Sequence, residues 1–516
     1  MLFNSYEFLI GFLPLCLALT CAARRFGRLP ALSILVLVSL GFYALWEAQY
    51  ILLLLSSIFF NYLMGNLVHA TRLRAVVLSG VLVNLAILGY FKYRIFFGEL
   101  SGLHSAEALV VPLGISFYTF HQISFLIDVN RKNISPRGFS EYLLYVTFFP
   151  QLIAGPIVRF TEVIGQFKTA SAFTPRAINF AVGFTMIAAG LFKKQILADT
   201  FAGYARPVFA LAETSASVTM IESWTGILAY TLQIYFDFSG YSDMALGIAR
   251  IFGIRLPVNF NSPYKATSII DFWRRWHISL SRFLRDYLYV VIGGNRGGRI
   301  RRYINVMIVM LLGGLWHGAD WTFVLWGGMH GGMLLINHAW RDLGGGKARH
   351  LRIPPAFAWF ITFLGVMLAW TLFRAESVHG ALNLWQGMLG INGRMALHDV
   401  DKQTLGDLGP ILEAIGFHWI NAEQVSRAFP TQTTFLWFAA GLFICLGLPN
   451  TQAWLRRYRP ACSLVYGDLD ARSVADFVSI SLRWRPTVPW ALLTAAMLIY
   501  AIFHFGNTSE FIYWQF

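Results

Sequence analysis

The chain alternates between long apolar stretches and short polar or basic connections along almost its whole length. Segments of about 20 apolar residues match the roughly 30 Å hydrocarbon core of a bilayer. We recognise them at Phe8–Ala23, Leu32–Trp46, Ile51–Val68, Val76–Phe91, Val110–Val129, Tyr142–Val158, Ile178–Leu197, Ile221–Ala249, Tyr303–Trp316, Trp321–Asn337, Phe357–Phe373, Thr433–Leu448 and Val488–Phe505. The pattern predicts an all-α polytopic membrane protein with about 11–13 membrane segments, some of them re-entrant or interfacial.

Composition supports this prediction and removes one class of partner. Hydrophobic residues make up 56% of the chain and charged residues 13%, against about 25% charged residues in soluble domains. The net charge of +15 could suggest nucleic acid. The basic residues lie in short loops between apolar segments, however, as the positive-inside rule predicts, so we expect membrane lipids as neighbours and no nucleic acid.

The basic loops also predict a topology. Arg24, Arg25 and Arg28 follow the first segment, which places its end in the cytoplasm; we expect that segment to be retained, because no basic residue precedes it. If Tyr142–Val158, broken by Pro150 and Pro156, dips in and returns, the other segments cross and both termini lie outside. We treat residues 1–516 as one integral-membrane domain.

Three polar interruptions stand out. Residues 392–430 carry balanced charge and suit the outer face, whereas the arginine-rich stretch Arg456–Arg485 suits the inner face. The third interruption, Asp271–Arg302, reads DFWRRWHISLSRFLRDYLYVVIGGNRGGRIRR. Its mixture of arginines and aromatic residues predicts a helix that lies in the membrane interface with Phe272, Trp276, Phe283 and Tyr287 on one side.

His317 is the strongest candidate for chemistry. It lies with Asp320 in the apolar, glycine-rich stretch LLGGLWHGADWTFVLWGG. An ionisable residue at membrane depth is costly and indicates a functional site. Burial favours the neutral imidazole, which can accept a proton from a hydroxyl group as a general base. The flanking glycines would allow another group to approach the backbone closely. The alternative is a core histidine that hydrogen-bonds a carbonyl between closely packed helices.

Other polar residues carry weaker predictions. His277, taken alone, fits an interfacial histidine better than a catalytic one, and His330 fits a structural role. GGNRGG, with Asn295 and Arg296, could offer backbone N–H groups and a guanidinium to a phosphate, or could be a flexible loop. For the intramembrane Asp237 and Asp243 we favour structural pairing. A serine-nucleophile motif, a HExxH motif and a zinc-type cysteine–histidine cluster are absent from the sequence, so we expect no metal.

Several long motifs, taken together, resemble one family. They are ILGYFKY, VPLGISFYTFHQISFLIDV, FPQLIAGPIVRF, IYFDFSGYSDMALG, DFWRRWHISLSRFLRDYLY, GGNRGG and LLGGLWHGADWTFVLWGGMHG. In this order they are similar to the membrane-bound O-acyltransferase family, and more narrowly to its bacterial alginate O-acetyltransferase branch. The resemblance covers nearly the whole chain and is densest from about residue 85 to 340, the expected catalytic core.

The resemblance implies a helical bundle around a central chamber, with His317 as the catalytic histidine and His277 as a second active-site residue. It implies a cytoplasmic thioester donor, acetyl-CoA, and no permanently bound cofactor. The predicted inner-face cluster of Arg274, Arg275 and Arg296, with Asn295, suits the phosphates of coenzyme A. A water-poor site would also limit hydrolysis of the thioester.

We therefore expect acetyl transfer across the bacterial inner membrane to an exopolysaccharide such as alginate. Cellulose, peptidoglycan or a teichoic-type polymer are alternative acceptors, and a proton-coupled transporter is an alternative of another class. The tail, residues 506–516, includes EFIYWQF. It resembles the terminus of a small partner of a D-alanyl-transferring relative, which implies that Tyr513 carries the acetyl group toward a periplasmic hydrolase-like acetyltransferase. The alternative is an aromatic anchor at the interface.

Overall fold

The computed structural model describes residues 2–101, 110–132, 134–136, 138–152, 155–169, 172–214, 216–344, 353–393, 395–398, 413–414, 417–420, 432–462 and 483–505. Tyr513, the tail 506–516 and most of the predicted outer loop 392–430 lie outside this set.

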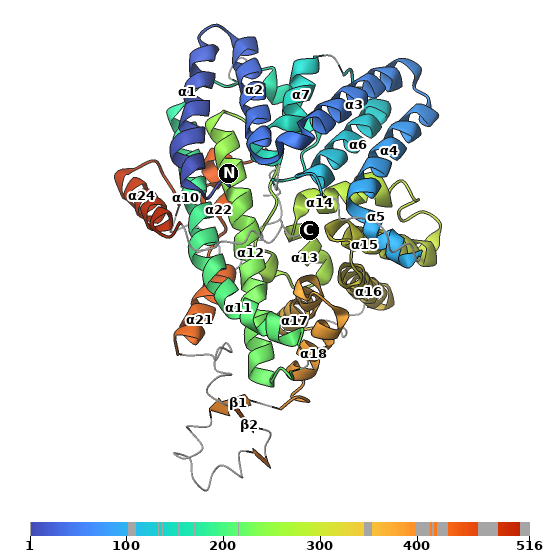
Figure 1. The fold of residues 1–516 in the computed structure, drawn as a ribbon, viewed down its shortest axis with the longest axis vertical. Coiled ribbons are helices and arrows are strands. Elements are labelled where there is room, and N and C mark those ends of the chain that lie inside the picture. Colours follow the sequence, from blue (N-terminus) through green and yellow to red (C-terminus); the bar gives the residue numbers. More distant parts are fainter. Residues whose placement is uncertain are drawn as a thin grey trace.

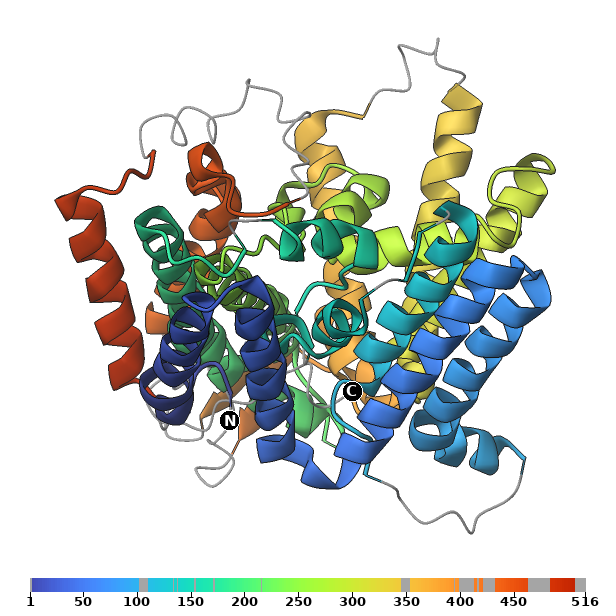
Figure 2. The same ribbon diagram turned by 90° about the horizontal axis from the view of Figure 1, so that it is seen from above.

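The first third of the chain forms helices that lie side by side (Figures 1 and 2). They are η1 (Glu7–Phe12), α1 (Leu13–Arg24), α2 (Arg28–Glu47), η2 (Ala48–Tyr50), α3 (Ile51–Thr71), α4 (Arg74–Leu88), η3 (Gly89–Tyr93), α5 (Arg94–Leu100), α6 (Ile115–Lys132), α7 (Phe139–Thr147), α8 (Phe149–Leu152) and α9 (Phe160–Phe167). The predicted proline break is present, because α8 ends at Leu152 and α9 begins only at Phe160.

The middle of the chain contains the helices that surround the candidate site. They are α10 (Ala177–Leu191), η4 (Phe192–Ala198), α11 (Asp199–Ala212), α12 (Met220–Ile251), η5 (Pro263–Lys265), α13 (Ile269–Arg275), α14 (Ile278–Phe283), η6 (Leu284–Tyr289), α15 (Gly298–His317) and α16 (Trp321–Gly344). The last described elements are α17 (Pro355–Arg374), α18 (Val378–Met388), β1 (Met395–His398), β2 (Phe417–Ile420), α21 (Gln432–Gly447), α22 (Thr451–Trp454), η9 (Arg456–Tyr458) and α24 (Val488–Phe503).

Helix α12 forms the centre of the molecule (Figure 1). Thr219 and Glu222 form a capping box at its start, and nearly every residue along it is buried. Because a helix that is apolar on all sides must be covered on all sides, α10 and α11 pack along it. Glycines make the contact close: a methyl group on Gly190 would collide with the backbone of Gly240 on α12.

The all-α membrane architecture is confirmed. Five continuous helical stretches among the described residues are long and apolar enough to cross a membrane: Glu7–Arg24, Arg28–Thr71, Arg74–Gly98, Ala177–Ala212 and Pro355–Arg374. Shorter apolar helices cover Gln432–Gly447 and Val488–Phe503. The short parallel pair of β1 and β2, with Met395 opposite Phe417, is a small addition that the apolar pattern did not predict.

The predicted interfacial helix within Asp271–Arg302 is wrong in one respect. The chain forms three short helical pieces, α13, α14 and η6, and the break between the first two lies at Trp276 and His277. The aromatic residues do not share one face: Phe272 and Trp276 belong to one buried cluster, and Phe283 and Tyr287 to another. The pattern of aromatic residues could not reveal the break, because it results from the backbone of two residues, the extended Trp276 and the left-handed His277.

Candidate active site

His317 is the last residue of α15, and Gly318 after it is extended. The final carbonyl groups of a helix have no partner within the helix. Here the Lys92 ammonium group, from η3, donates hydrogen bonds to the carbonyl oxygens of Trp316 (2.5 Å) and His317 (3.1 Å). Lys92 therefore fixes the backbone at the end of α15, and with it the position of the His317 side chain.

Glycines allow α15 and α16 to pack closely beside His317. A methyl group on Gly314 would collide with the carbonyl oxygen of Phe323, and one on Gly327 would collide with that of Met310. The group that approaches the flanking Gly314 is therefore the neighbouring helix α16, which is the helix packing of the alternative interpretation. Asp320, between the two helices, is exposed, and its carboxylate accepts a hydrogen bond from the Thr322 backbone N–H (2.8 Å). It caps α16 as aspartate commonly does.

The His317 ring is buried among aromatic side chains, with only 3% of the residue exposed. Its centre lies 5.1 Å from that of Trp326 and 5.2 Å from that of Phe373, both roughly perpendicular to it. These side chains come from α16 and α17, so elements distant in sequence complete the pocket wall. Such surroundings exclude water and favour a neutral imidazole.

His277 is fully buried and has a left-handed backbone, with φ of 41°. This conformation is costly for a residue other than glycine, and such strain tends to occur at functional sites. Its Nδ1 lies 3.0 Å from the Asn259 side-chain oxygen, and the Ile278 N–H donates to the Asn259 carbonyl. Because it is fully buried, His277 does not reach lipid at the interface.

The contacts of Asn259 determine which nitrogen of His277 carries the proton. The Ser279 backbone N–H and hydroxyl both donate to the Asn259 side-chain oxygen. Because a backbone N–H can only donate, the oxygen of the amide must face this side. His277 Nδ1 then donates as well, and in the neutral ring Nε2 carries the lone pair. Asn259 thus gives His277 a defined tautomer.

The structure brings the two histidines together although 40 residues separate them. Their ring centres lie 6.3 Å apart, too far for a direct hydrogen bond between ring nitrogens. His330 is also buried. It lies four residues after Trp326 on α16, and its Nδ1 accepts a hydrogen bond from Trp273 Nε1 (3.3 Å). His330 thus connects α16 to α13, an arrangement that agrees with a structural role.

The candidate phosphate-binding residues belong to two segments, the end of α13 and the turn before α15. Arg274 is exposed, whereas Arg275 forms an ion pair with Asp271 (2.9 Å). Arg296 and Asn295 are exposed in a turn whose four glycines all have positive φ, which explains the glycine content of GGNRGG. Asn295 accepts a hydrogen bond from the Tyr289 hydroxyl.

Arg296 lines a groove of about 1200 Å³ on the side of the molecule, which we call the lateral groove. Its walls come from α4, α6, α14, η6 and α15, and include Val81, Leu85, Phe120, Ile127, Leu288 and Leu312. At one end it reaches Trp316, the neighbour of His317. Arg274 and Arg275 are not among the described residues that line it.

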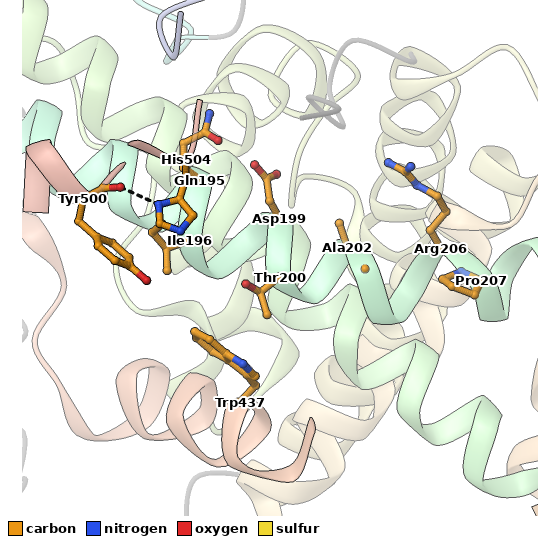
Figure 3. Close-up of a pocket in the computed structure, with 11 residues that line it drawn as sticks. Gln195, Ile196, Asp199, Thr200, Ala202, Arg206, Pro207, Trp437, Tyr500 and His504 are labelled. Atoms are coloured by element: carbon orange, nitrogen blue, oxygen red, sulfur yellow. Dashed lines mark hydrogen bonds between the residues drawn. The ribbon is translucent and has the colours of Figure 1, made fainter. Parts of the chain in front are cut away.

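A second cavity, of about 530 Å³, lies between η4, α11, α21 and α24 (Figure 3). Asp199, Thr200, Arg206 and Trp437 project toward it, and His504 bonds the carbonyl of Tyr500 at its edge. The described lining residues include neither His317 nor His277. Asp199 there accepts a hydrogen bond from Lys194 (2.8 Å). This cavity is therefore separate from the candidate active site.

The intramembrane aspartates have the predicted structural pairing, with lysines. Asp237 lies 2.8 Å from Lys194, and Asp243 lies 2.7 Å from Lys193. Thr451 and Gln452 donate further hydrogen bonds to Asp243. Both lysines belong to the π-helix η4, which turns them toward α12.

Sequence reasoning missed two residues of the site, Lys92 and Asn259. Lys92 carried a usable signal, because it is a charged residue within an otherwise apolar stretch, ILGYFKY. Asn259 carried no such signal, since asparagine is common in loops and its partners are 18 and 20 residues away in sequence.

Comparison with known proteins identifies the family. Residues 116–373 match the family described as MBOAT, membrane-bound O-acyltransferase family. The chain is 40% identical to the peptidoglycan O-acetyltransferase of Helicobacter pylori over 77% of this chain and 81% of the relative. It is 41% identical to the probable alginate O-acetylase of Pseudomonas aeruginosa, over 79% and 78%. It is 29% identical to the teichoic acid D-alanyltransferase of Streptococcus thermophilus, over 55% and 72%.

The matched region begins in α6 and ends in α17, and so contains both histidines and Asn259. These similarities are to acyltransferases, which removes the alternative of a proton-coupled transporter. The chain belongs to the membrane-bound O-acyltransferase family and is a multi-pass membrane O-acyltransferase.

Proposed function

We propose that this enzyme transfers an acetyl group from acetyl-CoA, at the cytoplasmic face of the bacterial inner membrane, toward hydroxyl groups of an exopolysaccharide such as alginate. The observation that carries the chemistry is the buried histidine pair, His317 and His277, with ring centres 6.3 Å apart. The 41% identity to a probable alginate O-acetylase supports an acetyl group and a polysaccharide.

In the proposed reaction the neutral His317 imidazole takes the proton of an acceptor hydroxyl as its oxygen attacks the thioester carbonyl carbon. The new C–O bond forms and the C–S bond breaks. The departing thiolate receives the proton from the imidazolium, which restores the neutral base. His277, whose Nε2 carries the lone pair, would orient the hydroxyl or share its proton. The water-poor aromatic wall would limit hydrolysis of the thioester.

Donor recognition is a separate part of the proposal. Coenzyme A carries several phosphates, for which guanidinium groups are well suited. Arg274 is exposed three residues before His277, and Arg296 with Asn295 is exposed in the glycine turn. Arg275 would have to exchange its Asp271 partner to contribute. Arg274→Gln should therefore raise the apparent KM for acetyl-CoA more than Arg275→Gln does.

The direct test uses purified protein, acetyl-CoA labelled in the acetyl group, and alginate oligosaccharides. We expect labelled ester, on Tyr513 or on the oligosaccharide, and free thiol from the wild type, and a loss of both in His317→Ala. Asp320→Asn is the matched control, because asparagine caps a helix as well as aspartate does. Equal transfer by His317→Ala would contradict its role as the base. Donor use restricted to a carrier-protein thioester would contradict acetyl-CoA.

Peptidoglycan is the second candidate acceptor, favoured by the 40% identity to a peptidoglycan O-acetyltransferase. Supplying glycan strands in place of alginate oligosaccharides distinguishes the two acceptors. If ester forms on the glycan strands and not on alginate, the acceptor is peptidoglycan and the proposed exopolysaccharide is wrong.

We further propose that the Tyr513 hydroxyl is the first acceptor: His317 takes its proton as the phenol oxygen attacks the thioester carbonyl, the C–S bond breaks, and the thiolate leaves with that proton. The acetyl group would then pass from Tyr513 to a periplasmic hydrolase-like acetyltransferase. A phenol, with an ordinary pKa of about 10, needs a base to act as a nucleophile near neutral pH. Tyr513→Phe removes only the hydroxyl group and should abolish polymer acetylation in cells. Full acetylation in that variant would show that the acetyl group passes directly to the acceptor and that Tyr513 is an anchor.

A further inference from the structure

The lateral groove has an apolar body and a basic end. Its walls are aliphatic and aromatic, and at about 1200 Å³ it is larger than the roughly 300–1,000 Å³ of ordinary small-molecule sites. Three arginines line it: Arg74 at the start of α4, Arg131 near the end of α6, and Arg296 in the turn before α15. These positions gather at one end, while Leu88 and Trp316 line the groove farther along.

The arginines keep their positive charge available. All three are exposed, and Arg131 donates one hydrogen bond to a backbone carbonyl, that of Asp286 (3.0 Å). The Asp286 carboxylate itself is bound by Arg159 and Arg285. Partial burial alone would raise the pKa of this carboxyl, but the hydrogen bonds and charges of Arg285 and Arg159 outweigh it and lower the pKa. Asp286 is thus ionised and engaged by other cations.

The groove opens where the protein faces lipid. Helix α4 is the first part of the candidate membrane span Arg74–Gly98. Within the most apolar part of this span, only 17% of the residues are buried inside the protein. Leu85 on α4 and Leu312 on α15 line the groove and are 45% and 44% exposed. Both ribbon views place α4 at the edge of the molecule beside α3 and α6 (Figures 1 and 2). A ligand in this groove would therefore exchange with the membrane.

We infer that the lateral groove binds an anionic phospholipid, with its phosphate on Arg74, Arg131 and Arg296 and its acyl chains along the apolar walls toward Trp316. Basic pockets between membrane helices on the cytoplasmic side are suited to anionic headgroups. Guanidinium groups bind phosphate oxygens in a bidentate manner. In a zwitterionic headgroup the lipid's own positive charge offsets part of this attraction. This inference does not depend on the proposed acetyl transfer, but it assigns Arg296 to the lipid phosphate instead of to a phosphate of coenzyme A.

The bound lipid would lie against a wall of the active site. Phe120 stacks on Phe283, with ring centres 4.0 Å apart, and on Trp316, with ring centres 5.0 Å apart. Phe120, Phe283 and Trp316 all line the groove, and Trp316 directly precedes His317. Acyl chains in the groove would therefore support this aromatic stack and should raise the thermal stability of the protein.

The test measures binding of phosphatidylglycerol and phosphatidylcholine to delipidated protein by native mass spectrometry. Each basic side chain contributes about fivefold to affinity for an anionic headgroup, so the double variant Arg74→Gln, Arg131→Gln should bind phosphatidylglycerol about 30-fold more weakly. Phosphatidylcholine binding should change little. The control is the double variant Arg25→Gln, Arg457→Gln, which removes the same charge from exposed positions outside the described lining of the groove.

A second variant, Leu85→Trp, fills the groove without changing charge and should weaken both lipids. Melting temperatures of all variants in detergent alone show whether each is folded. Equal phosphatidylglycerol affinity in the wild type and in Arg74→Gln, Arg131→Gln would overturn the inference. So would a raised apparent KM for acetyl-CoA in that variant with unchanged lipid affinity, because the arginines would then serve the donor. Displacement of phosphatidylglycerol by free coenzyme A would likewise assign the groove to the donor.

Discussion

Two regions of the molecule contain buried polar side chains, and they differ in the partners that those side chains have. Where η4 meets α12, Lys194 bridges Asp237 and Asp199, and Lys193 binds Asp243. At the end of α15, His317 and His277 lie among aromatic rings, and His277 is oriented by an amide. The first region holds full charges that are mutually compensated. The second holds neutral rings whose protonation can change during a reaction.

The difference teaches which intramembrane polar groups indicate chemistry. Ionisable residues at membrane depth are costly, so both regions indicate function by that criterion alone. A buried charge that already has a close counter-ion is costly to disturb and therefore suits a structural role. A buried imidazole held by a neutral partner can accept a proton without first breaking an ion pair. The identity of the partner, more than burial, separates the two regions.

The strongest way to test the comparison is to remove the proposed base. His317→Ala should reduce acetyl transfer about 10²- to 10⁴-fold, the usual contribution of a positioned base. His317→Gln, which nearly keeps the volume, should lose a similar amount. Melting temperature should change little in the second variant. Transfer near the wild-type rate in either variant would remove the distinction between the two regions.

The lysine–aspartate region should respond in the opposite way. Lys194→Met leaves Asp237 and Asp199 without their shared cation and should cost about 3–5 kcal/mol in the free energy of unfolding. Activity per folded molecule should remain. Adding Asp237→Asn should recover part of the lost stability, because one uncompensated carboxylate is removed. A folded Lys194→Met protein that is stable but inactive would instead place this region in the reaction.

Removing the orienting amide sharpens the comparison. Asn259→Leu leaves His277 without the acceptor that defines its tautomer, so we expect a loss of about 10- to 100-fold in kcat. The apparent KM for acetyl-CoA should change less. Asn259→Asp keeps an acceptor oxygen and should recover part of the activity while shifting its pH profile, because a charged partner stabilises the imidazolium form. An unchanged kcat in Asn259→Leu would mean that the tautomer of His277 is irrelevant.

The smallest expected effect is at Lys92. Lys92→Met removes the ammonium group from the last carbonyls of α15 and should allow a small shift of His317. A displacement of about 1 Å can cost about 100-fold, so a smaller shift should cost about tenfold in kcat with little change in KM. Lys92→Arg should restore part of the rate. In the His317→Ala background, Lys92→Met should cause no further loss; an additive loss would show that Lys92 acts elsewhere.

Much of the fold followed from apolar periodicity, because a bilayer demands long apolar helices with internally satisfied backbones. The proline break after Leu152 was visible as Pro150 and Pro156. The break at His277 was not visible, because no proline or glycine marks it. A left-handed backbone at a histidine is held by tertiary contacts, here the Asn259 backbone and side chain.

The sequence by itself determined the class of protein and the membrane environment, and it singled out the two histidines as candidates. These follow from composition, from the length of apolar segments and from motifs read in order along the chain. Only the tertiary structure decided that the histidines meet, that Asn259 sets the tautomer of one, and that Lys92 holds the helix end of the other. It also placed Arg296 with Arg74 and Arg131 in the lining of the lateral groove. The reason is physical: periodicity reports which face of a helix is apolar, whereas the partner of a buried polar group is chosen by packing between helices that are distant in sequence.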